Sequence, residues 1–159
     1  MIDINVNITK NVFNDVYLPY LNNQDRILII YGGAGSGKSV FATQRYVYRL
    51  LKEDNLNLIV ARKTARTNRD STFTLFKQII SKWRLNDFFK INASDMRLRC
   101  INGNCVIFIG LDDVEKIKSI TGETSEISDI WVEEASEITY DDFKQLNIRL
   151  RGGSKNKQI

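Results

Sequence analysis

The chain has 159 residues, of which 43% are hydrophobic and 26% are charged, and this length suits a single domain with a buried core. No apolar run approaches the ~18 residues needed to cross a bilayer, and residues 1–5 lack the basic and apolar parts of a secretory signal. We therefore expect a cytoplasmic protein without membrane contact. The formal net charge of +4 permits a phosphate-rich partner without requiring one. Histidine is absent, so acid–base chemistry falls to carboxylates and metal binding to oxygen ligands.

The apolar periodicity divides the chain into alternating strands and helices. Residues 1–25 are rich in Asn and weakly patterned, so we expect an irregular or short helical lead-in. Buried strands are predicted at 26–31, 56–61 and 130–132, and helices at 39–52, about 71–83 and 139–150. This alternation predicts an α/β fold with a mostly parallel sheet flanked by helices.

A β-hairpin is predicted at about 96–109, around the Asn102-Gly103 pair. A two-residue turn at that pair would place Cys100 opposite Cys105. The cysteines would then be close enough to bridge, although we favour two reduced, buried thiols.

The strongest motif is a glycine-rich loop that satisfies G-x-x-x-x-G-K-[S/T] at every position. Its residues are Gly32, Gly33, Ala34, Gly35, Ser36, Gly37, Lys38 and Ser39. In such a loop the backbone amides point at a phosphate, the lysine contacts the β- and γ-phosphates, and the hydroxyl of the last residue binds magnesium. A predicted strand precedes the loop and a predicted helix follows it, as this interpretation requires. The motif therefore predicts a site for a nucleoside triphosphate such as ATP, with Mg²⁺.

Two consecutive carboxylates follow the strand predicted at 130–132. We assign Glu133 to the magnesium site, where it acts through a metal-bound water, and Glu134 to the activation of the attacking water. Aspartate is the usual first acid, so Glu133 is a departure from the common pattern. The alternative is a pair of solvated glutamates at a strand end.

With these motifs placed, the chain resembles the N-terminal ATPase domain of the large terminase subunit of tailed bacteriophages, in the PBSX-type branch. The resembling segments are 31–39, 60–64, 69–73, 110–113, 116–120, 130–137 and 149–152. The resemblance implies a P-loop NTPase fold of the additional-strand (ASCE) type. It further implies ATP hydrolysis that drives double-stranded DNA into a capsid, by a homo-oligomeric ring of subunits bound to the portal protein and supplied by a small terminase subunit.

The resemblance also bears on domain organisation. Family members continue into a coupling strand, which lies between the strands of the two nucleotide motifs, and into a nuclease domain. We find neither before Ile159. We therefore expect residues 1–159 to form one ATPase domain that is incomplete at its C-terminus, and we expect no nuclease activity.

Several other residues are candidates for contacts with ligands or partners. Four basic residues, Arg62, Lys63, Arg66 and Arg69, are predicted either to contact DNA phosphates or a neighbouring subunit's nucleotide, or to form a solvated basic loop. Lys118 is either a cation acting in a neighbouring subunit or a surface lysine, and Gln24 either reads the adenine edge or is an exposed amide.

Two other functions remain open from the sequence. One is another DNA-linked P-loop ATPase, of a helicase-like or recombination type. The other is a nucleotide-binding protein without turnover, which the missing coupling strand favours.

Overall fold

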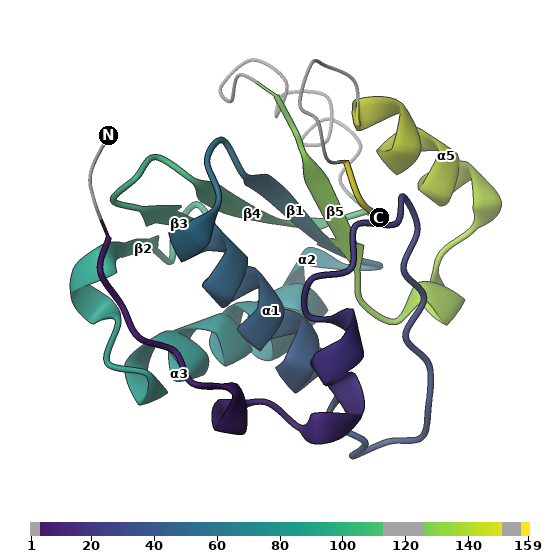
Figure 1. Ribbon diagram of the computed structural model, residues 1–159. Helices are drawn as coiled ribbons and strands as arrows, with labels where there is room; N and C mark the ends of the chain where they lie inside the picture. The colour runs from purple at the N-terminus through teal and green to yellow at the C-terminus, as the bar shows by residue number, and fades with distance from the viewer. Residues whose placement is uncertain (1–3, 113–125, 151–156) are drawn as a thin grey trace.

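The computed structural model describes residues 4–112, 126–150 and 157–159, and shows a sheet covered by helices on both faces (Figure 1). The strand order is β2-β3-β4-β1-β5. Their bounds are β1 Asn57–Arg62, β2 Phe89–Asn92, β3 Arg97–Cys100, β4 Cys105–Gly110 and β5 Asp129–Val132. β1 lies parallel to both β4 and β5, whereas β3 runs antiparallel to both of its neighbours. The predicted α/β fold is therefore confirmed, with a mixed sheet in which β4, β1 and β5 are parallel.

Helices α1 and α3 pack on one face of this sheet and α5 on the other. The helical elements are α1 Lys38–Lys52, α2 Ala65–Asn68, the π-helical η3 Arg69–Phe73, α3 Thr74–Lys82 and α5 Tyr140–Arg149. Short 3₁₀ turns lie at η1 Lys10–Val12, η2 Asp15–Tyr20, η4 Asn86–Phe88 and η6 Ala135–Glu137. No helix in these described ranges is long and apolar enough to cross a membrane.

The inner strand β1, which lies between β4 and β5, explains why the sequence forms three layers. Leu58 and Val60 join the core beneath α1 and α3, while Ile59 and Ala61 join the core beneath α5. A strand buried on both faces must be apolar at successive positions, and this is why 56–61 reads as a continuous apolar run. The predicted strands at 56–61 and 130–132 and the predicted helices at 39–52 and 139–150 are confirmed, with small shifts at their ends.

The predicted buried strand at 26–31 is wrong. These residues belong to no strand of the described sheet, and Ile27, Ile29 and Tyr31 are 52%, 77% and 90% exposed. The amide of Leu28 donates to the carbonyl of Ile159 at 2.9 Å, and the amide of Ile159 donates to Arg26 at 2.9 Å. Gln158 in turn bridges to Asp129 of β5. Residues 158–159 thus lie between the 26–31 segment and the sheet, and two hydrogen bonds are too few to form a ladder.

The predicted hairpin exists, but its register is shifted by one residue. Leu98 lies opposite Val106 and Arg99 opposite Cys105, while the amide of Cys100 donates to the carbonyl of Asn104. A two-residue type I′ turn needs a positive φ at both Asn102 and Gly103, but within this turn only Gly103 has one, at +96°, and the turn has three residues instead of two. A one-residue shift moves side chains to the other face of the sheet. Cys100 and Cys105 therefore lie in different cores as free thiols, and the expected juxtaposition is corrected.

Candidate functional site

The glycine-rich loop leads directly into the first turn of α1. Gly32, Gly35 and Gly37 have φ values of +151°, +76° and +86°, and side chains at these positions would be strained. Gly37 caps the helix, and its carbonyl accepts the first helical hydrogen bond, from Phe41, at 2.9 Å. The unpaired amides at this helix start form an anion-binding end, as the motif predicts.

The side chain of Lys38 is held within the loop. Its ammonium donates to the carbonyls of Gly32 at 2.8 Å and Gly33 at 2.9 Å, and to the hydroxyl of Ser36 at 3.2 Å. A phosphate bound in the loop would replace these three oxygens as the partner of the ammonium. The cation is therefore already positioned over the loop.

The structure brings Ser39 and Glu133 together, although 94 residues separate them in sequence. The hydroxyl of Ser39 donates to Oε1 of Glu133 at 2.6 Å. Glu133 directly follows β5, and its amide donates to the carbonyl of Ala61 at the end of β1. Because that hydroxyl proton points at the carboxylate, the lone pairs of Ser39 Oγ remain available to a metal ion. Both donors are oxygens, the ligand type that Mg²⁺ prefers, so these residues fit the predicted cation.

The next residue, Glu134, lies in a strained backbone conformation. Its φ of 53° and ψ of 59° are in the left-handed region, and it is solvent-exposed where the chain leaves the sheet. Such strain in a non-glycine residue costs on the order of 1–3 kcal/mol and clusters at functional sites. The strained turn is compatible with the water-activating role predicted for Glu134.

The lead-in contributes a contact to the loop that the sequence did not reveal. The hydroxyl of Tyr17 donates to the carbonyl of Ser36 at 3.0 Å, and the Tyr17 ring stacks on Phe41 with centroids 4.8 Å apart. Tyr17 comes from the weakly patterned first 25 residues. No sequence signal there could have linked it to a loop nineteen residues later.

Two of the predicted basic residues have partners within the chain. Arg62 forms an ion pair with Glu137 and donates to the hydroxyl of Ser71, while Lys63 forms an ion pair with Asp142. Arg66 and Arg69 are exposed on α2 and η3 and remain candidates for contacts with a partner. Lys118 lies outside the described residues.

Gln24 is not brought near the phosphate loop. It lines a separate cavity of about 360 Å³ with Arg49, Lys52 and Glu53, at the opposite end of α1. A helix of 15 residues is ~20 Å long, so Gln24 and the loop lie at two different ends of the domain.

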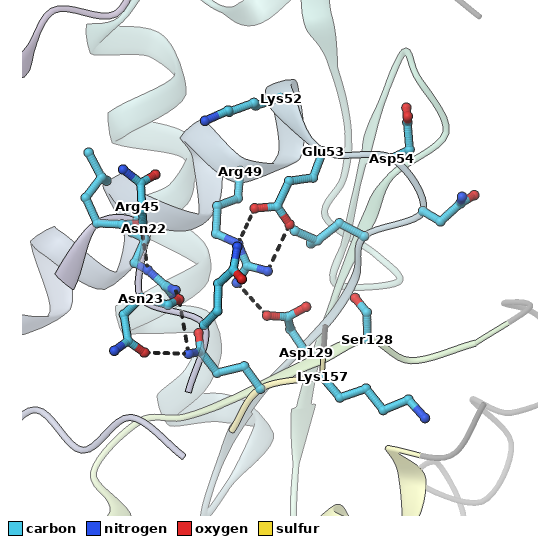
Figure 2. Close-up of a pocket in the computed structure, with 15 residues that line it drawn as sticks. Asn22, Asn23, Arg45, Arg49, Lys52, Glu53, Asp54, Ser128, Asp129 and Lys157 are labelled. Atoms are coloured by element: carbon cyan, nitrogen blue, oxygen red, sulfur yellow. Dashed lines mark hydrogen bonds and ion pairs between the residues drawn. The ribbon is translucent and has the colours of Figure 1, made fainter. Parts of the chain in front are cut away.

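This second cavity contains an ion-pair network that joins α1 to β5 (Figure 2). Arg49 contacts Asp129 and also Glu53, the latter at 2.7 Å. Burial alone would lower the pKa of the Arg49 guanidinium, but the hydrogen bonds that Arg49 donates to Glu53 and the negative charge of Asp129 outweigh it and raise the pKa. Arg45 donates to the backbone carbonyls of Leu21 and Asn23. The network therefore anchors the lead-in and the end of α1 to the sheet.

Comparison with known proteins gives the same assignment as the geometry. The family description of the phage terminase large subunit matches residues 24–159. The chain is 41% identical over 120 residues to the PBSX phage terminase large subunit of Bacillus subtilis (strain 168), and the match covers 76% of this chain and 27% of the relative. It is 32% identical over 111 residues to the terminase large subunit of Bacillus phage SPP1, covering 69% of this chain and 26% of the relative.

Solved structures show the same fold. The large terminase ATPase domain of Thermus phage P74-26 has a TM-score of 0.65 and 14% identity, and the match covers 86% of this chain and 61% of that one. The large terminase of a thermophilic bacteriophage, solved in complex with ADP, has a TM-score of 0.66 and 18% identity, covering 87% and 33%. The chain spans about a quarter of the length of the curated relatives that it matches. With the family match covering most of its residues, the chain belongs to the phage terminase large subunit family.

Proposed function

We propose that this chain hydrolyses ATP to drive double-stranded DNA into a viral capsid. The observation that carries the proposal is the pairing of Ser39 with Glu133, which places a carboxylate beside an intact phosphate loop in a member of this family. The resemblance to packaging terminases supplies the rest: a homo-oligomeric ring at the portal protein, a small terminase subunit that delivers DNA, and action in the host cytoplasm.

In the proposed reaction, each residue acts on a separate part of the nucleotide. The loop amides and the ammonium of Lys38 bind the β- and γ-phosphates. Ser39 and Glu133 would hold Mg²⁺, which when bound neutralises charge developing on the phosphate oxygens. Glu134 accepts a hydrogen bond from the attacking water and orients it toward the γ-phosphate.

We also propose that the domain is completed by a further parallel strand beside the 26–31 segment. Ile27, Ile29 and Tyr31 expose apolar side chains there, and only residues 158–159 lie between this segment and β5 among the described residues. Both observations support the incomplete domain expected from the resemblance. The exposed Arg66 and Arg69 are the described candidates for contact with DNA or a neighbouring subunit's nucleotide.

A second candidate function is nucleotide binding without turnover. The position of the 26–31 segment outside the sheet favours it, because only two backbone hydrogen bonds, both with Ile159, hold the segment before the loop in the described residues.

The test is Mg²⁺-dependent ATP hydrolysis by the chain, with and without linear duplex DNA, alongside two variants. Lys38→Ala should lose nucleotide binding. Glu134→Gln should bind ATP as the parent does but hydrolyse it ~10²- to 10⁴-fold more slowly. Stimulation by DNA would support the packaging function. ATP binding without turnover by the parent would support the second candidate, and equal turnover by Glu134→Gln would show that the base is another residue.

A further inference from the structure

A cavity of about 260 Å³ opens beside the Ser39–Glu133 pair. One wall is formed by these two residues, and the opposite wall by the η3–α3 segment, including Asp70, Thr74 and Gln78. Ser39 and Glu133 belong to the two nucleotide motifs, whereas the residues of the opposite wall belong to neither motif.

The backbone on both sides of Asp70 is held firmly against the sheet. The buried side chain of Asn68 donates to the carbonyls of Val60 at 2.8 Å and Ile109 at 2.7 Å. On the other side, Ser71 accepts a hydrogen bond from Arg62 at 3.1 Å. Asp70 itself lies in the π-helical turn η3, a conformation found often at functional sites. The position of Asp70 is therefore set by the sheet and not by a mobile surface loop.

Among the residues that the structure describes, Asp70 contributes the only charge on its wall. The neighbouring hydroxyls of Ser71, Thr72 and Thr74 donate back to helix carbonyls. The carboxylate of Asp70 has no hydrogen bond or ion pair with any other described residue. Within that same part of the chain, no lysine or arginine lines the cavity, so its charged lining residues are the two acids Asp70 and Glu133. This charge pattern suits a positive ligand.

We propose that Asp70 is a positioning residue for the hydrated divalent cation, acting from the side opposite Glu133. Mg²⁺ usually keeps several of its water ligands, and carboxylates beyond those waters accept their protons and fix their orientation. Glu133 already accepts the proton of Ser39, and Asp70 is the acid among the described residues that lines the other wall of the cavity. This inference rests on the proposed function, because the phosphates of the bound nucleotide supply further ligands to the metal.

The test is a Mg²⁺ titration of the binding of a fluorescent ADP analogue to the full chain, for the parent and for Asp70→Asn. Asparagine keeps the size of the side chain and removes its charge. We expect the Mg²⁺ concentration at half-saturation to rise about 10-fold, as for other partners of metal-bound groups. Binding of the same analogue in EDTA should be unchanged, which a merely structural effect would not allow.

Asp87→Asn is the matched control, because Asp87 is an exposed aspartate on η4, beyond the far end of α3. It should titrate as the parent does. An unchanged midpoint in Asp70→Asn, or an equal loss of binding in EDTA, would overturn the role of Asp70. Lys38→Ala distinguishes the inference about Asp70 from the proposed function. If Lys38→Ala binds the analogue normally, the proposed nucleotide site is wrong. If it does not bind while Asp70→Asn titrates like the parent, only the inference about Asp70 fails.

Discussion

At the scale of single residues, the phosphate loop depends on contacts that come from outside its own motif. Glu133 fixes the hydroxyl of Ser39 from the end of β5, and Tyr17 holds the carbonyl of Ser36 from the lead-in. The loop lies between these two contacts. The loop is thus held by two parts of the chain that lie far from it in sequence.

The Tyr17 contact gives a prediction about nucleotide affinity. Tyr17→Phe removes one hydrogen bond to the loop, a loss of about 1 kcal/mol, and should weaken nucleotide binding by about 3- to 10-fold. Turnover at saturating ATP should be unchanged, because the hydroxyl does not contact the reacting groups. Equilibrium binding and steady-state kinetics would measure the two effects separately. Tyr20→Phe is the control, since Tyr20 is 43% exposed and its hydroxyl has no hydrogen bond to the described residues; an equal loss in both variants would contradict the role of Tyr17.

At the scale of elements, α5 shows how a local signal sets a boundary. Thr139 accepts a hydrogen bond from the amide of Asp142, and the carboxylate of Asp142 accepts one from the amide of Thr139, which forms a capping box. Asp142 also pairs with Lys63 just beyond β1. The helix start is therefore fixed both locally and to the sheet.

The capping box predicts a pH dependence of stability. The hydrogen bond from the Thr139 amide lowers the pKa of Asp142 below its ordinary value of 3.8, so the carboxylate stabilises the fold fully above that value. This contribution is lost as the pH falls through the lowered pKa. At neutral pH, Asp142→Ala should reduce the free energy of unfolding by about 1 kcal/mol, and at about pH 3 by less.

Urea unfolding at the two pH values would measure this change. Asp141→Ala is the control, because Asp141 lies in the same first turn but outside the box. A loss from Asp142→Ala that matches the Asp141→Ala loss at neutral pH would show that the box contributes nothing.

At the scale of the whole molecule, one edge of the sheet is unlike the rest. Residues 158–159 lie beside β5, and the 26–31 segment lies on the outer side of residues 158–159 (Figure 1). The outward side chains of this segment form an apolar strip of Ile27, Ile29 and Tyr31. Exposed apolar strips on extended backbone promote association with other chains.

We therefore predict that the isolated chain self-associates through this strip. Ile29→Thr keeps a β-branched side chain but removes apolar surface, and should weaken association by up to about 10-fold. Sedimentation velocity over a range of protein concentrations would measure it. Val16→Thr makes the same kind of change at a residue that is 71% exposed on η2, and should have no effect. If neither variant alters association, the strip is not the contact.

The sequence alone determined the local features of this protein. The phosphate loop, the acidic pair after β5 and the helices α1 and α5 could be predicted because glycine spacing, apolar periodicity and capping residues act over a few neighbouring positions. The three-layer fold followed from strands that are apolar on both faces.

Only the tertiary structure decided which distant residues meet. The hairpin register depended on Asn102, which does not adopt the positive φ that a two-residue turn at the Asn-Gly pair would need. Whether residues 26–31 form a strand depends on a neighbouring strand that supplies backbone hydrogen bonds. No local sequence pattern contains that information. Gln24 lines a cavity at the far end of α1 from the loop, whereas Asp70 lines the cavity beside Ser39 and Glu133. Sequence spacing could not show either position, because the packing of α1 and η3 against the sheet sets these distances.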